Sequence, residues 1–166
     1  MDASRANRLT VAGLVAFILA AAAITYYGRT ELDKAQTPAP IDPRNAVQVE
    51  RGRAVYASHC ASCHGAQLQG QADWRIRLPD GRMPAPPHDA SGHTWHHADA
   101  VLFGITKHGL APPYAPKGHK SDMPAFGSVL PDPDIRAVLA FIGSRWPPEV
   151  VRWRSEMLDQ TRRQGK

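Results

Sequence analysis

The chain's two cysteines lie in one five-residue motif, CASCH at positions 60–64. Two thiols at this spacing can form a disulfide, share a zinc ion, act as a redox pair or attach a haem. A redox pair of the thioredoxin type needs a strand-to-helix setting, and the flanking sequence has no alternating strand pattern. A structural zinc site needs four ligands, and His59 and His64, directly beside the cysteines, can hardly complete a tetrahedron around one ion. A disulfide is chemically allowed but leaves His64 without a role.

Covalent haem attachment gives a role to all three functional groups of this motif. Cys60 and Cys63, on one helical turn, can each bond a vinyl group of a haem, and the histidine that follows them then faces the iron. The motif therefore predicts one haem c, held covalently through Cys60 and Cys63, with His64 as an iron ligand. A disulfide and a zinc site are the alternatives.

An uncharged apolar run covers residues 9–27, and Arg5 and Arg8 precede it. At about 1.5 Å per residue, a helix of this length spans about 28 Å, close to the hydrocarbon core of a bilayer at about 30 Å. The sequence therefore predicts a single transmembrane helix over residues 9–27 in the cytoplasmic membrane. The flanking arginines predict that residues 1–8 are cytoplasmic and that the remaining chain faces the periplasm. A signal peptide cleaved within residues 20–23 is the alternative.

The rest of the chain divides by composition into a linker, one domain and a tail. Residues 28–43 have three prolines, mixed charge and no apolar period, which indicates a linker. Residues 44–147 show helical periods separated by loops rich in proline and glycine, and no alternating strand pattern, so we expect an all-α domain. Residues 148–166 form a basic tail with a weaker helical pattern, which either docks through Trp153 and Met157 or is frayed.

Three helices are expected in this domain. The first begins either near Asp42, with Pro43 in its first turn, or near Asn45 as the capping residue, and it runs directly into the cysteine motif. The second follows an apolar period over residues 95–105 and ends at Gly109. The third has Asp132 as its cap and proline in its first turn, and it stops at Pro147.

With these features the domain resembles the class I c-type cytochromes over about residues 45–146. In that family an N-terminal helix with a glycine and an aromatic residue before the haem motif packs across the last helix. Here Gly52 and Tyr56 precede the first cysteine by eight and four residues. Val138 and Phe141 are the expected counterparts on the last helix. The resemblance implies an all-α, class I cytochrome c-like fold around one covalently attached haem.

The resemblance also implies a methionine sulfur as the second iron ligand. The family places this ligand in an MPxF-like loop just before the last helix, and Met123 begins such a stretch, MPAF. Met83 is the alternative, although it lies close to His64 in sequence for the usual wrap around the haem. Met157 is expected to fill space in the core.

The stretch between Met83 and the second helix holds two further expectations. In the family, a proline carbonyl accepts a hydrogen bond from the other ring nitrogen of the axial histidine, a role that Pro86 or Pro87 would fill. Four histidines follow, and we expect them to form hydrogen bonds at the surface or at the haem edge. A copper or zinc site, or a histidine in place of the methionine ligand, is the alternative for this group: His88, His93, His96 and His97.

Histidine–methionine ligation fills both axial positions of the iron, so the resemblance implies one-electron transfer and no small-molecule substrate. The net charge is +5, and Lys107, Lys117 and Lys120 flank the methionine loop, which favours a redox partner with an acidic docking surface. Nucleic acid is a poor fit, because no Lys/Arg run is interleaved with aromatic residues. The alternatives are an electron-transfer subunit of a larger dehydrogenase or oxidase, and a haem sensor or copper-handling protein.

Overall fold

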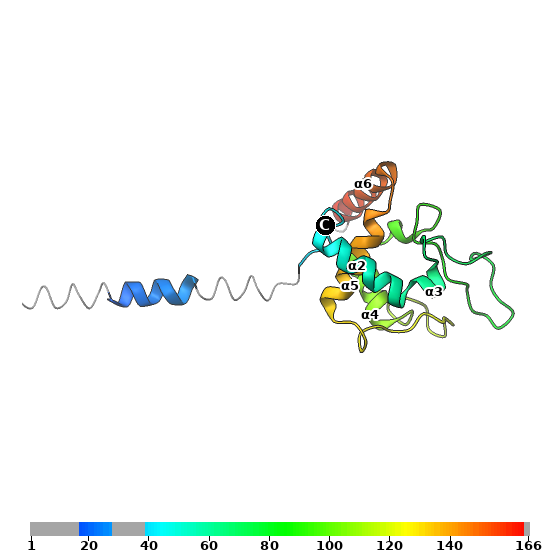
Figure 1. Cartoon of the computed structure of the whole chain (residues 1–166), viewed down its shortest axis with the longest axis horizontal. Helices are drawn as coiled ribbons and strands as arrows, with labels where there is room; N and C mark the ends of the chain where they lie inside the picture. The colour runs from blue at the N-terminus through cyan, green and yellow to red at the C-terminus, as the bar shows by residue number, and fades with distance from the viewer. Residues whose placement is uncertain (1–16, 28–38, 165–166) are drawn as a thin grey trace, which may run out of the picture. The chain divides into compact units, whose positions relative to one another are not determined.

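The computed structural model describes residues 17–27 and 39–164 and separates the chain into two units, Met1–Pro38 and Ala39–Lys166. The described residues of the second unit form helices joined by long loops, with no strand among them, so the all-α prediction is confirmed for this part of the chain. In chain order the helices are α2 (Ala46–His59), α3 (Ala61–His64), the 3-10 turn η1 (Thr94–His96), α4 (Asp99–His108), α5 (Asp132–Ser144) and α6 (Pro148–Gln164). Helix α5 packs against α2 and α4, and α6 packs on η1 (Figure 1).

In the first unit, residues 17–27 form a helix with exposed side chains. The rest of the predicted transmembrane segment, residues 9–16, lies outside the described residues, as do the predicted cytoplasmic residues 1–8 and residues 28–38 of the predicted linker. Across the described ranges, no helix combines the length and the apolar character needed to cross a membrane.

The packing of α2 against α5 forms the centre of the second unit. Gly52 lies so close to α5 that a Cβ there would clash with the carbonyl oxygen of Ala137. One turn further along α2, the buried ring of Tyr56 lies 5.3 Å from the ring of Phe141. Val138, the other predicted counterpart, is buried in the same core. The predicted packing of a glycine and an aromatic residue across the last helix is therefore confirmed, since only glycine permits this approach.

The starts of α2 and α5 are capped differently. Of the two predicted starts of α2, Asn45 is the cap, and its side chain accepts a hydrogen bond of 3.1 Å from the backbone N–H of Gln48. The predicted cap of α5 is wrong: Asp132 is its first helical residue, and the extended Pro131 precedes it. The Asp132 carboxylate instead pairs with Nζ of Lys107 at 2.6 Å. A carboxylate in the first turn also suits the positive end of the helix dipole.

Helix α4 starts later than the sequence predicts. Trp95 lies in the separate turn η1, and the two residues before Asp99 are extended (ψ 143° and 153°). The carbonyls of Trp95 and His97 accept hydrogen bonds from the guanidinium of Arg154, so they need no helical partners. Gly109 ends the helix as predicted.

Helix α6 docks through residues other than those predicted. Val150 and Arg154 are its buried side chains. Trp153 is 50% exposed, with its ring 6.2 Å from that of Trp95, and Met157 is half-buried. Val150 and Arg154 are therefore the main anchors of the tail, and the predicted Trp153 and Met157 contribute only partly buried contacts.

Candidate haem site

The cysteine motif lies at the junction of α2 and α3. The carbonyl of Cys60 accepts hydrogen bonds from the backbone N–H of Cys63 at 3.2 Å and of His64 at 2.9 Å. Gly65, with φ of 79°, then ends the turn in a conformation that favours glycine. The hydrogen bonds bring the two thiols and the imidazole together within one helical turn, the arrangement that haem attachment requires.

Both cysteines are free thiols; Cys60 is half-buried and Cys63 is exposed. Burial, and secondarily the nearby Cys63, raise the pKa of the Cys60 thiol to about 11. Since the thiolate is the species that attacks a disulfide, a protonated Cys60 disfavours disulfide exchange at neutral pH.

His64 is 8% exposed and its ring is held by one hydrogen bond. Its Nδ1 lies 2.8 Å from the carbonyl oxygen of Pro86, so of the two prolines predicted for this bond, Pro86 makes it. A carbonyl can only accept, so Nδ1 carries the proton and Nε2 keeps a free lone pair. Burial lowers the pKa of His64, which outweighs the opposing effect of the Pro86 carbonyl. The ring is thus a neutral imidazole with one nitrogen available for a metal.

The backbone behind His64 is fixed by Tyr56. Its hydroxyl donates a hydrogen bond of 2.9 Å to the carbonyl of Gly65 and lies 3.3 Å from that of His64. Burial is the main reason that the pKa of Tyr56 is raised, so the hydroxyl stays a donor at every physiological pH. The aromatic residue that marks the α2–α5 contact therefore also orients the haem motif.

His88 packs directly against His64. Its ring stacks on that of His64, with centroids 3.9 Å apart and planes at 25°. Its Nδ1 lies 2.7 Å from the hydroxyl of Thr94, and its carbonyl accepts a hydrogen bond of 2.8 Å from Nε1 of Trp146. His88 thus lies on the same side of the site as His64, which disfavours it as the second iron ligand in place of the predicted methionine. Neither Thr94 nor Trp146 was identified from the sequence, which carries no local sign of contacts to His88.

The other predicted histidines do not form a metal site. His93 stacks on Trp74, with centroids 5.4 Å apart, and it lies edge-on to His97 at 5.4 Å. These two histidines flank η1 and share no helix face. Among residues 17–27 and 39–164, no group of three or more His, Cys, Asp or Glu side chains could hold a metal ion.

Met123 lies in the non-helical segment before α5, half-buried and packed against the hydrophobic core that Cys60 also contacts. Its backbone N–H donates to the hydroxyl of Ser121 at 3.0 Å. Three residues later, the N–H of Phe126 donates to the carbonyl of Thr106 at 3.0 Å, which fastens the segment to α4.

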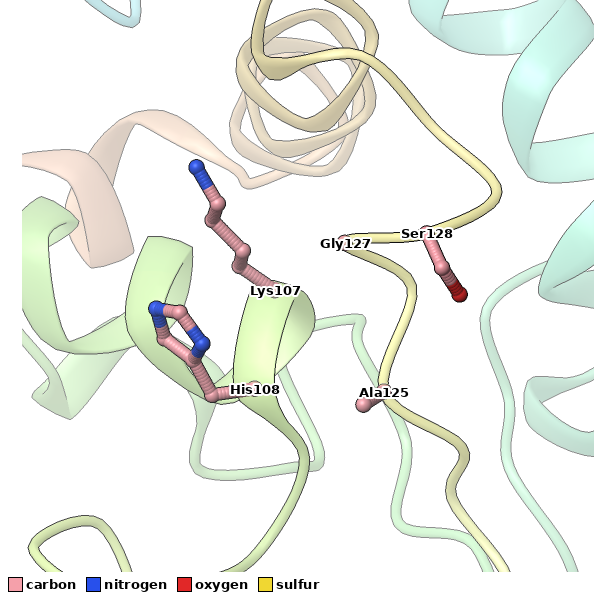
Figure 2. Close-up of a pocket in the computed structure, with 5 residues that line it drawn as sticks. All are labelled: Lys107, His108, Ala125, Gly127 and Ser128. Atoms are coloured by element: carbon pink, nitrogen blue, oxygen red, sulfur yellow. The ribbon is translucent and has the colours of Figure 1, made fainter.

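A shallow hollow lies outside the methionine segment, the non-helical residues 121–128 that include Met123. Figure 2 shows it between the end of α4, with Lys107 and His108, and the segment that carries Ala125, Gly127 and Ser128. The backbone N–H of Gly127 donates to the carbonyl of Lys107 at 2.9 Å, which links the two segments that line the hollow. The residues that line the hollow include no methionine or cysteine, so the hollow does not provide the predicted sulfur ligand.

The described residues fit a covalently bound haem, because two free thiols and a neutral imidazole with a free Nε2 share one turn. The family model described as "Cytochrome C oxidase, cbb3-type, subunit III" matches residues 47–142. The chain belongs to this family. It is a cytochrome c domain that binds haem c covalently, and Cys60 and Cys63 have the spacing of its CxxCH attachment motif. Comparison with curated proteins and with solved structures gave no further match. Trp146 and α6 lie beyond the matched segment of this cytochrome.

Proposed function

We propose that this cytochrome transfers single electrons through a haem whose iron lies between His64 and Met123. The observation that carries the proposal is the hydrogen bond from His64 Nδ1 to the carbonyl of Pro86, which leaves Nε2 for the iron. When bound, the haem supplies the one-electron couple.

The chain's own residues keep this couple in an apolar setting. Tyr56, Leu68 and Phe126 are buried in the core against which Cys60 and Met123 pack. A thioether ligand in such surroundings favours the ferrous state and keeps the potential high. Two protein ligands also leave no free position on the iron, which favours electron transfer over chemistry on a bound substrate.

The test replaces the methionine ligand and compares it with a control methionine. We expect Met123→Ala to keep the covalent haem, lower the midpoint potential, remove the sulfur-to-iron charge-transfer band in the near infrared and admit carbon monoxide. The matched control, Met83→Ala, changes none of these. Equal spectra for both variants and the parent would exclude Met123 as the ligand.

A second candidate role is that of the electron-transfer subunit of an oxidase complex. The description of the family, subunit III of a cbb3-type oxidase, favours this role. Purification from membranes under mild detergent, followed by haem staining of native gels, distinguishes the two. A haem band at the mass of a complex with oxidase activity supports the subunit, and a band at the mass of the single chain supports a separate shuttle.

We also propose that residues 9–27 tether the cytochrome to the cytoplasmic membrane with its haem domain in the periplasm. The length of the uncharged run and the arginines before it support this topology. Membrane fractionation, with protease treatment of spheroplasts, tests it. A soluble species whose N-terminus lies near Ala23 would show a cleaved signal peptide instead.

The partner in this proposal carries an acidic docking surface. Lys117 is exposed beside the methionine segment and is suited to steer such a partner. The other two lysines of the predicted basic group have partners of their own, since Lys107 pairs with Asp132 and Lys120 donates to the carbonyl of Asp80. Reduction rates that fall with ionic strength, less steeply in Lys117→Ala, would support this surface.

A further inference from the structure

We propose that α6 and Trp146, which lies just before it, act on the haem site as a brace, in which Arg154 and Trp146 are positioning residues for the axial histidine. The inference rests on the proposed role of His64 as an iron ligand. It assigns a function to the part of the chain that follows the family match.

The brace starts at Arg154, a guanidinium that is only 9% exposed. It donates hydrogen bonds to the carbonyls of Trp95, at 2.8 Å, and of His97, and it pairs with the carboxylate of Asp99 at 2.6 Å. A buried guanidinium is stable only when its donors are matched. These three acceptors fix the turn η1 and the start of α4 from one side chain.

The fixed turn holds the segment behind the axial ligand. Thr94, the first residue of η1, is buried, and its hydroxyl lies 2.7 Å from Nδ1 of His88 and 3.5 Å from the carbonyl of Pro87. The ring of His88 thus depends on the position of η1, and that ring stacks directly on His64.

Trp146 holds the same segment from a second direction. Its Nε1 donates a hydrogen bond of 2.8 Å to the carbonyl of His88, and the guanidinium of Arg154 lies over its ring at 5.2 Å from the centroid. The N–H of His88 in turn donates to the carbonyl of Leu68 at 2.7 Å. Both backbone polar groups of His88 are therefore engaged, with the tryptophan and the arginine of the brace in contact with each other.

The segment fixed in this way contains Pro86, whose carbonyl accepts the hydrogen bond from His64. That bond sets the orientation of the imidazole and raises its basicity, and a more basic axial ligand stabilises ferric iron. Loosening the brace should weaken the bond from His64 Nδ1 to Pro86. The midpoint potential should then rise, and the Nδ1 proton should exchange faster with solvent.

The experiment uses the full haem-loaded chain in detergent and four variants. Arg154→Ala removes the brace, Arg154→Lys keeps its charge with fewer donors, and Trp146→Phe keeps a ring but removes the Nε1 donor. Arg152→Ala is the matched control, because Arg152 is exposed on the same helix. The readouts are the midpoint potential and the exchange rate of the His64 Nδ1 proton, observed by NMR in the ferric form.

We expect Arg154→Ala to raise the potential and to speed the exchange about tenfold, the change that loss of one hydrogen bond gives. Arg154→Lys should bring the potential and the exchange rate part of the way back to those of the parent. Trp146→Phe should raise the potential and speed the exchange, as Arg154→Ala does. Arg152→Ala should match the parent in both. If Arg154→Ala does not fold, Trp146→Phe decides, since it keeps most of the buried volume.

Two outcomes overturn the proposal. Folded Arg154 and Trp146 variants with the potential and exchange rate of the parent would show that α6 only stabilises the domain. Equal shifts in Arg152→Ala would show a general effect of charge. If the proposed ligation itself fails, the ferric parent has no paramagnetically shifted His64 signal, so that failure is distinguishable from either outcome.

Discussion

The two sides of the candidate haem site are held by different kinds of interaction. On the histidine side, hydrogen bonds from buried or half-buried donors run to backbone carbonyls, as from His64 to Pro86 and from Trp146 to His88. On the methionine side, backbone hydrogen bonds hold Phe126 and Gly127 to α4, but beside Met123 itself Arg82 links the carboxylates of Asp80 and Asp122 at the surface.

This difference predicts different behaviour for the two proposed ligands, His64 and Met123. Buried hydrogen bonds resist salt, and breaking one leaves an unpaired polar group. Exposed ion pairs contribute little each and are screened by salt. We therefore expect the histidine side to be the rigid part of the site and the methionine side to be the part that opens.

The largest expected effect is at His64, the proposed axial ligand. His64→Ala should abolish formation of the haem-loaded cytochrome, because no other described group offers a neutral imidazole on the turn that carries the cysteines. The measurement is haem per polypeptide by the pyridine haemochrome assay. His96→Ala, which changes an exposed ring, is the control. Normal haem content in His64→Ala would contradict the assignment.

The second prediction concerns the helix contact that supports the histidine side. Gly52→Ala places a Cβ against the carbonyl oxygen of Ala137, so α2 must move away from α5. We expect the free energy of unfolding to fall by about 2–4 kcal/mol, as for overpacked or strained cores. Denaturation by guanidinium chloride measures it. Ala57→Ser, at an exposed position of the same helix, should change it little.

The third prediction uses pH to separate the two sides. Burial is the main cause that places the pKa of His88 well below its usual value of 6.5. The unfolded chain therefore binds a proton that the folded chain excludes, and stability should fall as pH drops below 6.5, by up to about 1.4 kcal/mol per pH unit. Asp80, on the methionine side, responds at lower pH. The hydrogen bond from Arg82 lowers the pKa of Asp80, so its contribution to stability is lost only as the pH falls below 3.8, the usual pKa of this side chain.

Unfolding by denaturant at several pH values between 4.5 and 7.5 tests this, with the limits chosen to bracket the histidine range. His88→Phe keeps a ring against His64 and should flatten the profile. An unchanged slope in this variant would show that other groups, His93 and His97 among them, cause the dependence, since burial lowers their pKa as well.

The smallest expected effect is on the methionine side. Arg82→Ala removes the link between Asp80 and Asp122, the residue before Met123. We expect imidazole to displace the methionine about threefold faster at low ionic strength, the scale of one exposed ion pair. The difference should vanish at about 1 M salt, where the screening length is about 3 Å. Stopped-flow absorbance of the ferric form measures the rate.

Two comparisons sharpen this test. Arg53→Ala removes an ion pair with Glu50 on the outer face of α2 and should leave the rate unchanged. Trp146→Phe removes a hydrogen bond on the buried histidine side, so any change that it causes in the displacement rate should not depend on salt. If the rate of Arg82→Ala stays elevated at high salt, the contrast between the two sides is wrong.

Some features of this cytochrome follow from the sequence because they depend on residues close together in the chain. The motif at 60–64 forms one helical turn, so its spacing alone brings two thiols and an imidazole together. Asn45 caps α2 through a side chain that reaches only three residues ahead. The pairing of Gly52 and Tyr56 with α5 was also predictable, because the resemblance supplied the partner helix.

Only the tertiary structure decided how the histidine side is built. Trp146 meets His88 across 58 positions, and Arg154 meets Trp95 across 59. The same long-range contact delays the start of the predicted second helix, because Arg154 takes up carbonyls that a longer α4 would have used. Asp132 likewise paired with Lys107 instead of capping α5. Local propensity fixes what a short segment prefers, but a side chain with several possible partners takes the one that folding brings within hydrogen-bond distance.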